Sequence, residues 1–281
     1  MSDLTFASKA KLSDGNEIPL LGFGTYEMTN EEAYRCVTWA LEAGYRHIDT
    51  AEWYENEAAC GRAVRDFCAS NNVPRSEIFY TTKLMLNNGY DKVRESIRRS
   101  VKLSGLEYVD LYLVHGPIGG AEMRKQSWRA VCDAKKEEGT LRSIGITTFG
   151  VRHLEEILSI EGVEVPVVHQ IDLHPFMSRA EIVEFSKARG MLMEAWAPLV
   201  RALRFEHPAI RGLADKYKKS PAQVLLRYSL QKGYVPLPKS ASKDRIISNK
   251  DVFDFSLSED EMKQLSSLNE NLVTDWDPTD D

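Results

Sequence analysis

The sequence predicts one α/β domain folded as a (β/α)8 barrel, in which eight parallel strands alternate with helices after an N-terminal β-hairpin. Strand and helix patterns alternate along the chain, which favours parallel β-α units over an antiparallel sandwich. The length of 281 residues is close to the roughly 250 that one barrel needs. Three strand patterns also run into ionisable residues, as expected at the rim where barrels place their active sites. We therefore expect a single domain over residues 1–281.

The strands follow from local composition. Asp14-Gly15 is a common two-residue hairpin turn, so the opening segment is expected to form a hairpin. After it, short runs rich in β-branched, aromatic and leucyl residues indicate buried strands. The eight strands are expected near residues 20–23, 46–49, 78–82, 109–114, 141–146, 167–171, 191–196 and 234–237.

Capping signals mark the helices between these strands. A hydroxyl residue followed three positions later by Glu predicts a helix start, as does a cap residue before a helix-opening proline. Glycines are expected where helices end. The starts are Thr29 with Glu32, Ser178 with Glu181, Ser220 with Pro221, and Ser258 with Glu261, and the ends are Gly44, Gly105, Gly139 and Gly190. The acidic tail D-W-D-P-T-D-D after the last helix is expected to be loosely ordered.

Composition restricts the partners and the location. The net charge is −6, and without a long basic run nucleic acid is not expected as the main partner. Nothing approaches the apolar run of about 18 residues that a membrane span requires, and no secretory signal is visible. We expect a cytoplasmic monomer. The four cysteines, which lack C-x-x-C spacing, are expected mainly as small buried hydrophobic residues: Cys36, Cys60, Cys68 and Cys132.

Four ionisable residues lie at the ends of successive predicted strands or in the loops just after them: Asp49 and Tyr54 at the second, Lys83 at the third and His115 at the fourth. These side chains should converge, because parallel strands of a barrel end at one rim. The Lys83 ammonium should favour the Tyr54 phenolate and so lower the tyrosine pKa, while Asp49 keeps a buried lysine charged. His115 could hydrogen-bond a substrate oxygen. Together they would polarise and protonate a carbonyl, and would lack only a source of hydride.

A nucleotide site of the Rossmann type is not predicted, because Gly22-Phe23-Gly24 lacks the third glycine of its fingerprint. Barrels often hold phosphate with the loops after their last two strands. Here the eighth strand runs into P-K-S-A-S-K-D-R-I-I-S-N, in which Lys239, Ser240, Lys243 and Arg245 could bind a dianion. Composition alone is equally consistent with a solvated basic turn.

Several motifs follow one another along the chain: D-T-A-E-x-Y-x-N-E with Gly61, T-K at the third strand, H-x-P after the fourth, G-I-T-T-F, Q-I-D-x-H-P, E-A-W-A-P-L and P-K-S-x-x-x-x-R-I-x-x-N. In this order they resemble the aldo-keto reductases, over essentially the whole chain. The resemblance implies reduction of an aldehyde or ketone to an alcohol with NADPH, which becomes NADP+. By matching positions, Tyr54 is expected as the general acid, Lys83 and Asp49 as its tuning pair, and His115 as the residue that orients the carbonyl.

The same resemblance implies the cofactor contacts. The family more often has Ser-Asn and Tyr where this chain has Thr147-Thr148 and Trp196, but the hydroxyls and the stacking face are retained. The expected contacts are Gln170, Thr147 and Thr148 for the nicotinamide carboxamide, Trp196 under the nicotinamide ring, Lys239, Ser240 and Arg245 for the 2′-phosphate, Asn249 for the adenine, and also Gly24, Thr25, Tyr26, Pro198 and Leu199.

The substrate pocket is expected to be wide. Gly116 stands where the family commonly has an aromatic residue, and the chain has no long tail to fold over the barrel mouth. Tyr26 and Trp53 would then shape a shallow entrance that accepts varied small aldehydes with little discrimination.

Two other functions fit parts of the sequence. A metal-dependent hydrolase could use His47, Asp49, Lys83, His115 and His169 on successive strand ends, but it would leave Tyr54 and the basic segment after the eighth strand without a role. No metal is expected. A non-catalytic nucleotide-binding or structural protein could share the barrel, because a fold does not determine a function.

Overall fold

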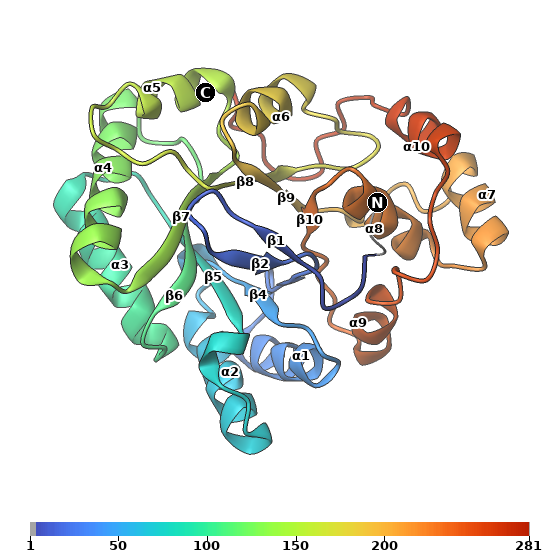
Figure 1. Ribbon diagram of the computed structural model, residues 1–281, viewed down its shortest axis with the longest axis horizontal. Coiled ribbons are helices and arrows are strands. Elements are labelled where there is room, and N and C mark those ends of the chain that lie inside the picture. Colours follow the sequence, from blue (N-terminus) through green and yellow to red (C-terminus); the bar gives the residue numbers. More distant parts are fainter. Residues whose placement is uncertain (1–3, 281) are drawn as a thin grey trace.

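The computed structural model describes residues 4–280, and its parallel strands form the predicted barrel (Figure 1). Eight strands neighbour one another in the order β10-β9-β8-β7-β6-β5-β4-β3. The N–H groups of Gly22 and Gly24 donate to the carbonyl oxygens of Pro236 and Pro238, each at 3.1 Å. These bonds join the first strand segment to the last, so the curled sheet closes into a ring.

The strand bounds agree with the expected positions at seven of the eight places. The first is shifted: the predicted strand at 20–23 overlaps the observed one only at Phe23, because the Leu20 N–H still pairs with the Ser8 carbonyl of the preceding hairpin segment, at 3.1 Å. The barrel strands are β3 (Phe23–Gly24), β4 (His47–Asp49), β5 (Phe79–Leu84), β6 (Val109–Val114), β7 (Leu141–Thr147), β8 (Val168–Asp172), β9 (Leu192–Trp196) and β10 (Val235–Pro236).

Helices surround the sheet, and most of the predicted caps are present. The hydroxyls of Thr29, Ser220 and Ser258 each accept the predicted backbone hydrogen bond. The predicted box at Ser178 is wrong, because the Ser178 N–H donates to Asn269 Oδ1 at 2.9 Å and Arg179 becomes the cap residue. The helices are α1 (Asn30–Glu42), α2 (Glu57–Asn71), α3 (Tyr90–Ser104), α4 (Ala121–Glu138), α5 (Val151–Leu158), α6 (Ala180–Lys187), α7 (Pro208–Tyr217), α8 (Pro221–Gln231), α9 (Lys243–Asn249) and α10 (Glu259–Ser266).

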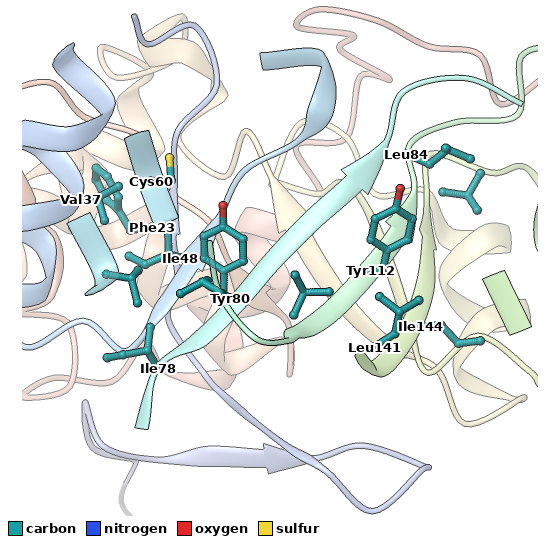
Figure 2. Close-up of a cluster of buried hydrophobic side chains, with 14 of the residues drawn as sticks. Phe23, Val37, Ile48, Cys60, Ile78, Tyr80, Leu84, Tyr112, Leu141 and Ile144 are labelled. Carbon is teal, nitrogen blue, oxygen red and sulfur yellow. The ribbon is translucent and has the colours of Figure 1, made fainter. Parts of the chain in front are cut away.

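Alternation along the strands separates the outer core from the barrel interior. Ile48, Tyr80 and Tyr112 pack toward the helices, together with Val37 of α1 and Cys60 of α2 (Figure 2). Successive strand side chains point to opposite faces, so their neighbours His47, Asp49, Thr81 and Lys83 point inward. The same pattern that builds the outer core therefore directs polar residues into the barrel.

The N-terminal hairpin lies across one end of the barrel (Figure 1). It consists of β1 (Lys9–Lys11) and β2 (Glu17–Pro19), and Gly15 turns between them with a φ of 92°. Leu12 and Ile18 of the hairpin pack against inward residues of three strands, among them Phe79, Leu111 and Val168. This apolar plug fills the end opposite the carboxyl ends of the strands, which leaves the other rim for a site.

No helix in residues 4–280 is long and apolar enough to cross a membrane. All four cysteines lie in helices, and the prediction of small buried residues holds for Cys36, Cys60 and Cys132, while Cys68 is half-buried.

Candidate active site

The four ionisable residues predicted to converge do meet at the rim. Asp49 ends β4, Tyr54 ends the 3-10 helix η1 (Glu52–Tyr54), Lys83 lies in β5, and His115 follows β6. Lys83 Nζ donates to Asp49 Oδ1 at 2.6 Å, to the Thr50 carbonyl oxygen at 3.0 Å and to the Tyr54 hydroxyl at 3.3 Å. The rings of Tyr54 and His115 meet edge to face, 5.5 Å between centroids.

A buried glutamate holds Tyr54 in place. Glu52, at the start of η1, accepts a hydrogen bond from the Met85 N–H at 3.0 Å and pairs with Arg99 of α3. These contacts tie η1 to the end of β5, so the tyrosine and the lysine are carried on segments that are joined to each other.

Lys83 is charged although it is completely buried. Burial opposes the ammonium form, but Asp49 and Tyr54 together outweigh it and raise the lysine pKa. A buried ion pair of this kind contributes little net stability, yet removing one partner would leave an uncompensated charge. The pair therefore fixes a positive charge beside the tyrosine hydroxyl.

The expected lowering of the Tyr54 pKa is wrong for this geometry. Burial raises it to about 12, and the Lys83 ammonium offsets only part of that effect. Tyr54 thus carries its proton at neutral pH, as a proton donor must. If Tyr54 gave up this proton, the Lys83 ammonium would stabilise the phenolate left behind.

His115 is neutral. Burial lowers the pKa of its imidazole well below the usual value, and Lys83 adds to the effect. Its Nδ1 atom has no hydrogen-bond partner among the described residues. A neutral imidazole can donate one N–H to a substrate oxygen, but it cannot act as an acid by losing an imidazolium proton. His115 can therefore donate a hydrogen bond to a ligand oxygen as a neutral group, while Tyr54 retains its proton.

Behind this group lies a carboxyl that the sequence analysis missed. Glu194 of β9 is fully buried, and burial, reinforced by Asp49, raises its pKa to about 8. The Gln170 amide donates from Nε2 to Asp49 Oδ2 at 3.0 Å and to Glu194 Oε2 at 2.9 Å. Gln170 therefore connects the Lys83 ion pair to a protonated carboxylic acid, and its rotamer is fixed from two sides. A glutamate inside a strand pattern was the available signal.

A cavity of about 740 Å³ opens at this rim and contains most of the residues expected to bind a cofactor. Asp49, Tyr54 and His115 line it, whereas Lys83 lies behind its wall. Thr25 does not line it, because the Thr25 hydroxyl donates to the Asp49 carbonyl oxygen inside the core. The expected cofactor residues on the lining are Gly24, Tyr26, Thr147, Thr148, Gln170, Trp196, Pro198, Leu199, Lys239, Ser240, Arg245 and Asn249.

The basic part of this lining suits an anion. In the described part of the chain, no carboxylate lies within ion-pair distance of Lys239 or Arg245, although both face the cavity. Lys243, also suggested by the sequence, pairs instead with Glu42 at 3.6 Å and does not line the cavity. Arg245 Nε donates to the Ser240 hydroxyl at 3.3 Å. Cations at a cavity wall that lack a carboxylate partner among the described residues fit the phosphate groups of a dinucleotide.

The cavity differs from the expected wide substrate pocket, because the C-terminal tail forms part of its wall. Asp275 and Trp276 line the cavity, whereas Gly116 does not. A Cβ atom at Gly116 would lie 3.1 Å from Trp276 Cζ3, so the indole covers the place where the glycine was expected to leave a gap. The predictions of a loose tail and an uncovered mouth are wrong. Trp53 and Tyr26 do line the cavity, as expected.

The metal-hydrolase alternative finds no support in the arrangement of its ligands. His169 points away from the barrel interior and toward the helices. There its Nδ1 lies 2.8 Å from the Ser186 hydroxyl of α6, and its Nε2 accepts a hydrogen bond from the Phe149 N–H. His47 contacts the Thr81 hydroxyl at 3.2 Å. Across residues 4–280, no group of three or more His, Cys, Asp or Glu side chains is placed to hold a metal ion.

Comparison with known proteins agrees with this geometry. Residues 20–270 match the family model described as "Aldo/keto reductase family". An uncharacterized oxidoreductase of Schizosaccharomyces pombe is 41% identical, with 96% of this chain and 97% of that protein covered. The methylglyoxal reductase DkgA of Escherichia coli is 38% identical, with 95% and 96% covered.

Solved structures give the same result. An aldo-keto reductase from Bombyx mori, solved in complex with NADP, superposes with a TM-score of 0.90 at 33% identity, over 99% of this chain and 97% of that one. An aldo/keto reductase from Brucella melitensis gives 0.89 at 38% identity, over 95% and 100%. Aldo-keto reductases are oxidoreductases that use NADP(H). This chain therefore belongs to the aldo-keto reductase family.

Proposed function

We propose that this protein reduces aldehydes or ketones to alcohols with NADPH, and that Tyr54 is the general acid. The observation that carries the proposal is the contact of the Tyr54 hydroxyl with the Lys83 ammonium, 3.3 Å apart, at a cavity that is also lined by Lys239 and Arg245, cations with no carboxylate partner within residues 4–280. A metal-dependent or non-catalytic role would leave this arrangement without a use.

The residues divide the work on the carbonyl. The neutral His115 donates an N–H to the carbonyl oxygen and orients it toward Tyr54. Tyr54 then transfers its proton to that oxygen, and the Lys83 ammonium stabilises the resulting phenolate. Asp49 keeps Lys83 charged through the reaction. NADPH, when bound, supplies the hydride that the carbonyl carbon receives.

The residues that line the cavity support a division of the cofactor contacts among them. Thr147, Thr148 and Gln170 would hold the carboxamide end, and Trp196 offers an aromatic face for the nicotinamide ring. Because both Gln170 Nε2 hydrogens already serve Asp49 and Glu194, its carbonyl oxygen is the atom left for a ligand. Lys239, Ser240 and Arg245 would hold the 2′-phosphate, with Asn249 near the adenine.

Replacing Tyr54 by Phe tests the proposal. Since general acid catalysis contributes about 100- to 10,000-fold, Tyr54→Phe should lower kcat by an amount in that range. Cofactor affinity, followed by NADPH fluorescence titration, should remain near that of the wild type, because the ring stays in place. Turnover is measured with a panel of aldehydes and ketones that includes methylglyoxal.

Tyr34→Phe is the matched control, because its hydroxyl bonds to Asp66 on the outer helices at 2.9 Å, away from the cavity. A Tyr54→Phe enzyme as active as this control would refute the assignment of the acid. A wild-type protein that binds NADPH but reduces none of the carbonyls would refute the proposed reaction.

A further inference from the structure

In the pocket wall, Trp276 covers a glycine that is far from it in the sequence. The Trp276 indole lies over Gly116, where an added Cβ atom would come within 3.1 Å of Cζ3 and 3.4 Å of Cζ2. The segment beneath is held firmly, because Asn87 Nδ2 donates to the carbonyl oxygens of Gly116 and Ile118 at 2.7 and 2.8 Å. A larger side chain at 116 could therefore be accommodated only if Trp276 moved.

Ion pairs hold the tail on both sides of Trp276. Before it, Asp275 lies 3.6 Å from Arg201, in the segment after β9. After it, Asp277 pairs with Arg179 at 2.9 Å, and Arg179 is itself fixed by two hydrogen bonds to the buried Asp172.

The tail is also held by backbone packing at its end. The Thr279 carbonyl lies so close to Gly150, at the start of α5, that a side chain there would not fit. The tail accordingly lies beside the start of α5 at Thr279 (Figure 1). The tail that carries the Trp276 indole is thus fixed at several points, although it has no regular secondary structure.

We propose, building on the function above, that Trp276 is the specificity-determining wall of the substrate pocket and selects carbonyl compounds with a flat aromatic or apolar group. The wall continues through Trp53, whose ring centroid lies 6.5 Å from that of Trp276, to His115, 6.1 Å from Trp53. A carbonyl held by Tyr54 and His115 would direct its substituent against these indoles. Flat apolar groups gain most there, because aromatic contact adds to the burial of apolar area.

Charge at the entrance adds a second preference. Asp275 and Glu27 both line the cavity and share one cation, Arg201. This local excess of negative charge disfavours substrates that carry a carboxylate in the part that contacts Asp275 and Glu27.

Trp276→Ala measures the effect of the wall directly. The readout is the ratio of kcat/KM for benzaldehyde to kcat/KM for propanal, with NADPH and the full-length protein. We expect the ratio to fall about 10- to 100-fold, mainly through KM for benzaldehyde, because propanal reaches the wall with little of its surface. The NADPH dissociation constant should not change. Val273→Ala, in the same tail but exposed and outside the cavity lining, is the matched control and should leave the ratio unchanged.

Gly116→Trp/Trp276→Ala tests whether the two positions are interchangeable. If an indole at residue 116 can replace the one at 276, the double variant should recover most of the benzaldehyde preference that Trp276→Ala loses. The effects of the two substitutions on the kcat/KM ratio would then be strongly non-additive. Should Trp276→Ala fail to fold, Trp276→Leu keeps apolar bulk without a flat face and is judged by the same ratio.

An unchanged ratio in a folded Trp276 variant that still reduces both aldehydes overturns the assignment of the wall and leaves the proposed reaction intact. A wild-type enzyme that binds NADPH but reduces neither these two aldehydes nor any other carbonyl of the panel overturns the proposed reaction instead. The two failures are therefore distinguishable.

Discussion

At the scale of single residues, the site depends on which buried groups carry charge. Lys83 is held positive by Asp49, while Glu194 and His115 are kept neutral by burial. Gln170 bridges the ionised carboxylate and the neutral one. If Glu194 were also ionised, two carboxylates would share one amide group. The protonation of Glu194 therefore helps to direct the single positive charge toward Tyr54.

This assignment predicts how stability depends on pH. The pKa of Glu194 is about 8 in the folded protein and 4.5 ordinarily, so between these values the folded state binds more protons than the unfolded state. The wild type accordingly loses stability as pH rises through this window, and the loss is complete above pH 8. Glu194→Gln, which cannot ionise, should escape it. The free energy of unfolding of Glu194→Gln minus that of the wild type should therefore increase by on the order of a few kcal/mol from pH 5.5 to pH 8.5.

Urea denaturation at the two pH values measures this shift. The value at pH 5.5 serves as the internal reference, because most wild-type Glu194 is still protonated there and the two proteins differ little in charge. A difference that is the same at both pH values would mean that Glu194 is not the titrating group.

At the scale of elements, the sequence predicted what depends on local pattern. The strand ends that carry Asp49, Lys83 and His115 followed from apolar runs bounded by polar residues, and the caps at Thr29, Ser220 and Ser258 from side chains that reach only three positions. Ser178 and the tail could not be predicted in this way. Their structure depends on contacts from distant segments, through Asn269, Arg179 and Gly150, which no local pattern encodes.

Two helical glycines provide a test of packing between elements. Gly61 of α2 lies against the end of α3, where a Cβ atom would come within 2.6 Å of Ser104 Cα. Gly61→Ala should destabilise the protein by about 1–3 kcal/mol, because the helices would have to move apart. Gly212 of α7 has nothing within 4 Å of its added Cβ, so Gly212→Ala should stabilise by about 0.5–1 kcal/mol through helix propensity.

The same substitution thus has opposite signs at the two positions. Urea midpoints with unchanged m-values are the measurement. Equal effects at the two sites would show that the contact between α2 and α3 is not close enough to exclude a methyl group.

At the scale of the whole molecule, the barrel is closed at one end and narrowed at the other by the two ends of the chain. The hairpin plugs the barrel floor through Leu12 and Ile18, and the tail covers part of the mouth through Trp276. The cavity between them is lined by residues that are spread along the sequence from Gly24 to Trp276. A ligand bound there would connect elements from nearly the whole sequence, and so should stabilise the fold as a unit.

Cofactor binding should therefore raise the melting temperature, and the increase should reveal which cofactor is preferred. A ligand at 100 times its dissociation constant stabilises the folded state by about 2.7 kcal/mol. Lys239 and Arg245 face the cavity without carboxylate partners in the described residues, and NADH lacks the phosphate that they would bind. Charged hydrogen bonds contribute about 1.5–3 kcal/mol each, so Lys239→Gln and Arg245→Gln should each weaken NADPH binding roughly 10- to 150-fold. The increase in melting temperature caused by NADPH should become smaller in these variants, while the increase caused by NADH stays as in the wild type.

Lys243→Gln, which removes a neighbouring cation that pairs with Glu42, is the matched control and should keep the full NADPH shift. Losing the NADH and NADPH shifts to the same extent in the Lys239 and Arg245 variants would mean that these cations hold a part common to both cofactors, and the 2′-phosphate would have to be bound elsewhere.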